Sequence, residues 1–232
     1  MKRLAVRLMA GLLLLMLTAC GASAPEESVA APTSDMAVTP DTGTAITDLD
    51  GLVASLKDSS VTRAHITTDL TIAPESDESF EREGFVLTID EGVTVTIGDF
   101  FTPVFFGSET EAGIVNNGTL IVAANWNFGA LTLENNGTIQ VQSNVLLAPG
   151  MGTIQNNGTL QIDKDAEIRL ERGSGLINDG VIKNDGTLNI TTDGGSLINN
   201  ESGSILNNGH IAWDGDYQNR GNYRGTEPLP KT

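Results

Sequence analysis

The sequence predicts an all-β protein built as a parallel β-helix, a solenoid in which each coil contains three short strands. The pattern I-x-N-N-G-T-L-x-V occurs five times between Ala112 and Trp213, and repeats of roughly 20 residues are typical of stacked solenoid units. After each Asn-Gly pair, apolar and polar residues alternate, which indicates a strand with one buried face. Shorter apolar runs before each copy indicate two more strands, so the faces become buried only when coils stack.

The aligned copies place the same residue types in columns at a corner of the coil. These corner residues are Asn116, Gly118, Asn135, Gly137, Asn156, Gly158, Asn184, Gly186, Asn207 and Gly209. Because Asn and Gly tolerate positive φ, we expect a sharp corner with left-handed backbone in each copy. We also expect the stacked amides to hydrogen-bond in ladders between coils, with ligand binding as the alternative role. An Asn-Gly corner is typical of antiparallel hairpins too, but its recurrence once per coil favours parallel stacking.

The distance between the third and fourth copies is longer than the others, with 28 residues from Gly158 to Gly186. The intervening segment 163–175 reads DKDAEIRLERGSG. We expect this segment to lengthen the fourth coil and to present a solvated strand face, on which exposed charge pairs contribute about 0–1 kcal/mol each.

Residues 1–19 have the pattern of a signal peptide. Lys2 and Arg3 precede an apolar run, Leu8–Leu17, that is too short to be read as a membrane-spanning helix. The following motif L-T-A-C-G resembles the lipobox of bacterial lipoproteins. This resemblance implies cleavage before Cys20, lipidation of Cys20, and anchoring in the cell envelope on the outer face of a bacterial membrane. Cys20 is the only cysteine, which excludes an internal disulfide.

Two short regions precede the predicted solenoid. Residues 20–47 hold the lipidated cysteine and a stretch of Ala, Ser, Thr and Pro that cannot bury enough surface to fold, so we expect a disordered tether. Residues 48–60 are predicted to be a helix, because Thr47 and Asp50 resemble a capping box and the apolar residues that follow share one face. Such a helix covers the open strand edges of the first coil, or it binds a partner.

The predicted helix is followed by HITTDLTI and then by LTIDEGVTVTI. This order resembles the start of right-handed parallel β-helix proteins of the pectin-lyase-like superfamily, over roughly residues 47–213. The resemblance implies a right-handed solenoid on a bacterial surface, here over residues 61–213. Residues 214–232 are expected to form a C-terminal cap and tail. The superfamily includes lyases, hydrolases, adhesins and scaffolds, so the resemblance does not select a function.

Most of the large aromatic residues lie in two segments, 98–111 and 123–129, that interrupt the repeats. The candidate ligand-binding residues are Phe100, Phe101, Phe105, Phe106, Trp126 and Phe128. One interpretation is a satellite core along the flank of the solenoid. The other is an exposed aromatic platform, because exposed aromatic side chains mark binding sites.

The sequence offers little chemistry for catalysis. G-x-S-x-G, H-E-x-x-H, Walker and Cys/His metal motifs are absent, so we expect no cofactor and no metal site. The formal charge of −17 disfavours nucleic acid as a partner. Asp163 or Asp165 with Arg169 or Arg172 is the one candidate acid–base set.

The sequence therefore predicts a lipid-anchored cell-surface protein whose solenoid is a non-enzymatic structural or adhesive binding module. Its expected partners are the membrane, through the lipid, and a glycan or a surface protein. The alternative function is a polysaccharide lyase or glycoside hydrolase that uses the side loops of the solenoid.

Overall fold

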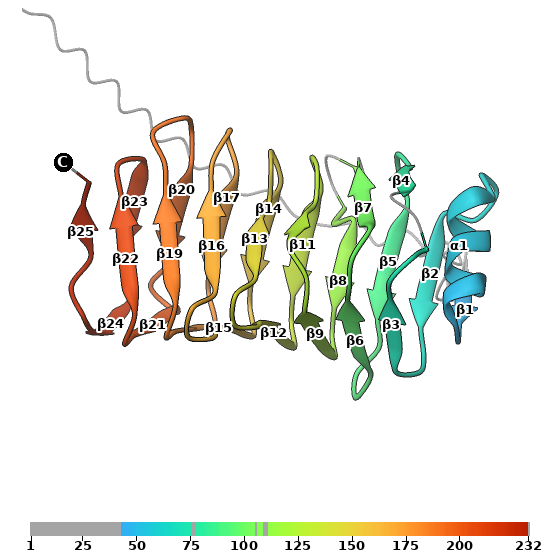
Figure 1. Ribbon diagram of the computed structural model, residues 1–232, viewed down its shortest axis with the longest axis horizontal. Coiled ribbons are helices and arrows are strands. Elements are labelled where there is room, and N and C mark those ends of the chain that lie inside the picture. Colours follow the sequence, from blue (N-terminus) through green and yellow to red (C-terminus); the bar gives the residue numbers. More distant parts are fainter. Residues whose placement is uncertain (1–42, 76–77, 105, 109–110, 232) are drawn as a thin grey trace, which may run out of the picture. The chain divides into compact units, whose positions relative to one another are not determined.

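A computed structural model describes residues 43–75, 78–104, 106–108 and 111–231. The predicted fold class is confirmed: parallel strands, three to a coil, stack in a row that starts at one short helix (Figure 1). The signal peptide, Cys20, the tether up to residue 42, and Phe105 lie outside the described residues.

Two long parallel sheets form two walls of the solenoid. The first wall contains β1 (Thr44–Ile46), β2 (Arg63–Ile66), β5 (Val86–Ile89), β8 (Ile114–Asn116), β11 (Thr132–Asn135), β14 (Thr153–Asn156), β17 (Gly175–Asn178), β20 (Ser196–Asn199) and β23 (Asp216–Asn219). The second wall contains β3 (Leu70–Ile72), β6 (Thr94–Ile97), β9 (Thr119–Val122), β12 (Thr138–Val141), β15 (Thr159–Ile162), β18 (Val181–Asn184), β21 (Ser204–Asn207) and β24 (Asn222–Gly225).

The third wall is shorter and closes each coil. It contains β10 (Trp126–Asn127), β13 (Leu146–Ala148), β16 (Glu167–Leu170), β19 (Thr187–Ile190), β22 (His210–Trp213) and β25 (Leu229–Pro230). The two-stranded sheet of β4 (Glu78–Glu81) and β7 (Phe101–Val104) continues this wall toward the helix. The two parts meet where the Gly129 amide donates to the Pro103 carbonyl, 3.2 Å away.

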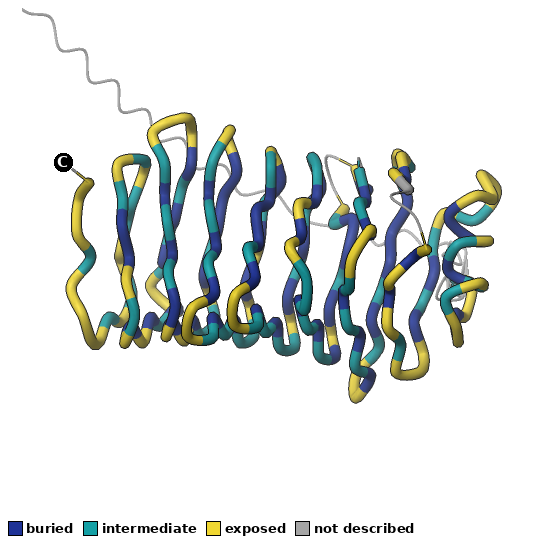
Figure 2. Tube along the Cα trace, viewed as in Figure 1, coloured by how far each residue is buried: buried dark blue, intermediate teal, exposed yellow. Residues whose placement is uncertain are grey.

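The core lies inside the coils. Because strand side chains alternate between faces, every second residue points inward, and Figure 2 shows buried positions alternating along the strands while most corners are exposed. Inward residues of successive coils stack in register. In the second wall the buried column is Leu120, Ile139, Leu160, Ile182 and Ile205. The apolar columns of the three walls merge into one continuous core.

The helix α1 (Leu49–Lys57) closes one end of this core. Asp48 is its N-cap, and the Asp48 carboxylate accepts a hydrogen bond of 2.8 Å from the Gly51 amide. Leu52 and Leu56 are buried on the face that α1 turns toward β1 and β3. The predicted capping helix is therefore present, although it is shorter than residues 48–60.

The solenoid extends beyond its predicted limits at both ends. β1 lies within the segment predicted to be a disordered tether, and it pairs in parallel with β2. At the other end β23, β24 and β25 pair with β20, β21 and β22, so most of the predicted C-terminal cap forms a further coil.

The fourth and fifth repeats lie at a different corner from the first three. Asn184 and Asn207 end second-wall strands, whereas the first-wall residues in register with Asn156 are Asn178 and then Asn199. The predicted single column of five Asn residues is therefore two columns.

The same shift explains the long spacing between repeats. One coil separates Asn156 from Asn178, and the next Asn-Asp-Gly corner follows one strand later at Asn184. Segment 163–175 holds the regular third-wall strand β16 and its turn, not an insertion that lengthens a coil. The expectation of a longer fourth coil was wrong.

Candidate functional site

Four of the six candidate aromatic residues are buried. Phe101 and Phe106 are each 3% exposed, Trp126 is 2% exposed and Phe128 is fully enclosed. The Trp126 ring lies 6.3 Å from Phe101 and 4.9 Å from Phe128, centroid to centroid. These side chains fill the interior behind β7 and β10, so they cannot form an exposed platform. Trp126 in particular has no face on which a ligand could stack.

Phe100 is the one candidate whose side chain the structure places at the surface, 53% exposed. It has a φ of 68° in the turn that leads from the second wall toward β7. Asn144 and Asp165 take this left-handed conformation at the corresponding corners of later coils. Asn and Asp adopt it far more readily than a bulky residue does, so this turn carries local strain.

The inner Asn residues form an amide ladder inside the solenoid. Each Nδ2 donates to the Oδ1 of the next coil over 2.6–2.7 Å, in the order Asn116, Asn135, Asn156, Asn178, Asn199 and Asn219. The first five are fully buried. The same nitrogens also approach backbone carbonyls of the next coil, for example Asn135 to Thr159 at 3.0 Å. Because these amides bond to one another, they serve stacking rather than ligand binding.

A second ladder runs along the other corner. The Asn184 amide donates to Asn207, which donates in turn to the hydroxyl of Tyr223 over 2.9 Å. Among the described residues, the side-chain oxygen Oδ1 of the first Asn in each ladder, Asn116 and Asn184, has no hydrogen-bond partner. The residues in register beneath them are Ile89 and Ile162, which have no amide to donate.

The corner glycines are required for a reason other than the predicted one. Gly118, Gly137 and Gly158 are not among the residues with positive φ, so the expectation of left-handed backbone there was wrong. Instead, a Cβ built on Gly137 would lie 2.0 Å from the Gly118 carbonyl oxygen, and one on Gly209 would lie 2.1 Å from the oxygen of Gly186. Successive coils approach so closely at these corners that only glycine fits.

The candidate acid–base set does not converge. Gln140 and Gln161 each donate to the Asp163 carboxylate over 2.8 Å. Arg169 pairs instead with Glu167 at 2.9 Å, and this hydrogen bond raises the pKa of Arg169. Within the described ranges, no three His, Cys, Asp or Glu side chains come together as a metal site.

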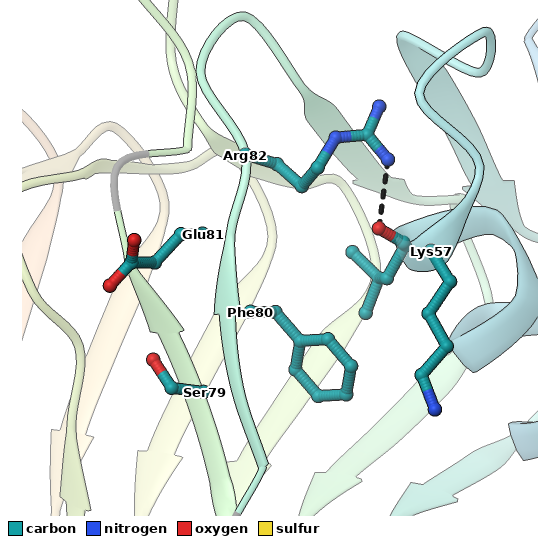
Figure 3. A pocket seen from close by; sticks show the side chains of 6 residues that line it. Lys57, Ser79, Phe80, Glu81 and Arg82 are labelled. Atoms are coloured by element: carbon teal, nitrogen blue, oxygen red, sulfur yellow. Dashed lines mark hydrogen bonds between the residues drawn. The ribbon is translucent and has the colours of Figure 1, made fainter.

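A surface depression lies between the C-terminal end of α1 and strand β4. Its lining residues are Leu56, Lys57, Ser79, Phe80, Glu81 and Arg82 (Figure 3). The Arg82 guanidinium donates to the carbonyls of Ser55, Leu56 and Asp58 at 2.8–3.1 Å, and one of these bonds is dashed in Figure 3. Its Cζ also lies 5.2 Å from the centre of the Phe85 ring. Arg82 thus joins the helix to the solenoid, a role that no motif in the sequence indicates.

A second depression lies at a first-wall corner near the C-terminal end. Its lining residues are Asp179, Asn200, Glu201, Ser202 and Arg220. Asp179 accepts hydrogen bonds from Ser202 at 2.7 Å and from Asn200 at 2.9 Å, and these bonds lower the pKa of Asp179. Since the carboxylate is held by the corner of the following coil, it too serves the stacking of the coils.

No helix in the described part of the chain is long and apolar enough to cross a membrane. Comparison with family models, with curated proteins and with solved structures finds no match for this chain. The functional argument therefore depends on the solenoid and on the side chains that its walls present.

Proposed function

We propose that this protein is a lipid-anchored component of a bacterial cell surface, in which the solenoid is a non-enzymatic structural and adhesive binding module for glycans. The proposal depends mainly on one observation, the outer face of the second wall. Residues 1–42 supply the anchor in this proposal, through the lipobox-like motif and Cys20.

The second-wall face consists of two outward columns in register. Over β6, β9, β12 and β15 its residues are Thr94, Thr119, Thr138 and Thr159 in one column and Thr96, Ile121, Gln140 and Gln161 in the other. Beyond β15 the columns continue with Val181 and Ser204 and with Lys183 and Leu206. Equivalent side chains recur about every 4.8 Å along the stack. Hydroxyl and amide groups both donate and accept hydrogen bonds, as sugar hydroxyls do. An extended glycan lying across β6, β9, β12 and β15 would meet mostly hydroxyl and amide groups at successive coils.

One feature favours binding over catalysis, and another favours neutral ligands. Glycoside cleavage needs an acid or base positioned at the reacting bond, whereas Asp163 is held by two glutamine amides and Arg169 by Glu167. The formal charge of −17 favours neutral glycans over anionic polymers as ligands.

A glycan array probed with a fragment that begins at residue 43 and holds the whole described solenoid tests the proposal. We expect neutral glycans to bind and no reducing or unsaturated ends to be released. Thr138→Ala and Gln161→Ala should weaken binding, whereas Gln155→Ala should not, because Gln155 is exposed on the first wall. Glycan binding that is unchanged in Thr138→Ala and Gln161→Ala would contradict the assigned face. Turnover of any glycan would contradict the non-enzymatic role.

The anchor has its own test in the full chain. Wild-type protein made in a bacterial host should carry lipid on Cys20 and partition into detergent, whereas Cys20→Ser should not. An unmodified Cys20 in membrane-bound protein, identified by mass spectrometry, would rule the anchor out without affecting the glycan proposal.

A further inference from the structure

The chain contains four Asn-Gly pairs, at residues 117–118, 136–137, 157–158 and 208–209. All four Asn side chains are exposed. In three pairs the glycine amide donates to an inner Asn carbonyl of the preceding coil: Gly137 to Asn116 at 3.0 Å, Gly158 to Asn135 at 2.8 Å and Gly209 to Asn184 at 2.9 Å. The Gly118 amide has no such bond to any described residue.

The exception follows from the coil beneath it. The corner between β5 and β6 contains Asp90, Glu91, Gly92 and Val93 and is longer than an Asn-Gly corner. Asn117 N–H donates to the Ile89 carbonyl at 2.9 Å, and Thr119 N–H donates to the Val93 carbonyl at 2.8 Å. Gly118 lies between these two bonds. The amides of Asn136 and Gly137 both donate to the Asn116 carbonyl, whereas only the Asn117 amide, and not that of Gly118, donates to the Ile89 carbonyl.

The side-chain amides differ in the same way. The Nδ2 atoms of the other three donate to the coil before: Asn136 to Asn117 at 3.1 Å, Asn157 to Asn136 at 2.9 Å and Asn208 to Asp185 at 2.9 Å. Asn117 only accepts in this outer row, and its Nδ2 has no acceptor among the described residues. At three pairs, therefore, both the glycine backbone nitrogen and the Asn Nδ2 are hydrogen-bonded to the preceding coil. At Asn117–Gly118 neither nitrogen has an acceptor among the described residues.

We propose that Asn117–Gly118 is a site of intramolecular deamidation in the folded protein, and that the other three Asn-Gly pairs are protected by the stacking of the coils. The Gly118 backbone nitrogen attacks Cγ of Asn117, so an N–Cγ bond forms and the Cγ–Nδ2 bond breaks. The amide proton leaves with Nδ2 as ammonia. Water then opens the resulting succinimide at either carbonyl, giving aspartate or isoaspartate. The net change is gain of water and loss of ammonia.

The two products have different consequences for the corner. Aspartate fits, because Asp185 already occupies an equivalent outer position and accepts from Asn208, as Asp179 accepts from Asn200. Isoaspartate inserts an extra main-chain atom between β8 and β9. This displaces either the Asn117 or the Thr119 bond to the coil beneath. Formation of isoaspartate therefore weakens the stack next to Asn116, where the buried amide ladder begins.

The experiment follows the four pairs within one molecule. The full chain is incubated at mildly alkaline pH, digested, and mapped by mass spectrometry for conversion of amide to acid. The pairs at 117, 136 and 157 share the sequence Asn-Asn-Gly-Thr, so their intrinsic reactivities match. We expect conversion at Asn117 to be at least about tenfold faster, the factor given by a local opening free energy of about 1.4 kcal/mol at the other pairs.

Two controls isolate the cause. In denaturant the three matched pairs should convert at equal rates, because the stacking that protects two of them is gone. Hydroxylamine should trap the succinimide at residue 117 in the folded protein, and isoaspartate should appear there together with aspartate. Equal rates among the pairs in the folded protein, faster conversion at Asn136 or Asn157, or formation of aspartate alone would each overturn the proposal.

Discussion

The corner glycines are tightly constrained single residues, because the backbones of successive coils approach each other closely there. At Gly137 the preceding coil passes so near that even one methyl group meets the carbonyl oxygen of Gly118. The buried Asn side chains next to these glycines bond from coil to coil, so each corner combines a tight backbone with a satisfied polar core.

Replacing Gly137 with valine should therefore separate two coils. We expect Gly137→Val to lower the free energy of unfolding by at least about 2 kcal/mol, because overpacking forces backbone shifts. Gln155→Val is the matched control, since Gln155 is exposed on a strand of the next coil. Denaturant unfolding of both variants measures the difference, and equal midpoints would contradict the steric role of the glycine.

The sequence identifies the corner residues but not what each of them does. Asn-Gly is compatible both with positive φ and with close approach, and only stacked coils reveal which one applies. Burial of Trp126 was equally hidden, because β10 has two residues and is too short to show an alternating pattern. Phe100, in contrast, is exposed in a turn, as the interpretation of an exposed aromatic platform required.

At the scale of elements, the two ends of the solenoid are built differently. The helix α1 covers β1 and β3 and is fastened by Arg82. At the other end Tyr217 of the final coil packs against Trp213 of the coil before it, with ring centroids 6.0 Å apart, and Pro230 lies in β25. Proline has no amide hydrogen to donate, so it weakens this edge as a template for another strand.

Arg82→Met should loosen α1 while keeping most of the apolar stem. The variant leaves the carbonyls of Ser55, Leu56 and Asp58 without their charged donor, so we expect a loss of about 2 kcal/mol or more. Hydrogen exchange should accelerate in residues 49–57 ahead of the rest of the chain. Arg224→Met, at an exposed position of β24, is the control and should leave exchange in α1 unchanged. Unaltered exchange in both variants would show that the helix does not depend on Arg82.

The only two tyrosines of the chain lie in the final coil. Burial raises the pKa of Tyr217 to about 12 and, more weakly, that of Tyr223. In Tyr223→Phe, where burial of Tyr217 remains, absorbance should therefore show tyrosinate forming well above pH 10 in folded protein, and near pH 10 in denaturant. Because the folded-state pKa is raised, the stability contributed by neutral Tyr217 is complete below about pH 10 and is lost as pH rises toward 12. Titration near pH 10 while the protein is still folded would show that the final coil is not packed.

At the scale of the whole molecule, period-2 alternation is enough to predict the solenoid and most of its core. Columns such as Leu120, Ile139 and Leu160 are visible in the sequence and are fully buried. The sequence does not show to which wall each repeat belongs. The same Asn-Asn-Gly corner ends first-wall strands at Asn135 and second-wall strands at Asn207, because both corners join one short parallel strand to the next.

The register of the walls has a consequence for changes in chain length. Deleting residues 136–156 would join Asn135 to Asn157 and bring β11 against β17, with Asn135 facing Asn178. We expect this shortened chain to fold cooperatively, with a somewhat lower melting temperature that circular dichroism can measure. Deleting residues 136–146 removes about half a coil, moves strands to the wrong wall, and should abolish cooperative unfolding. If both deletions behave alike, register does not control folding. If they differ as expected, the solenoid can lengthen or shorten only in whole coils, in steps of roughly 4.8 Å.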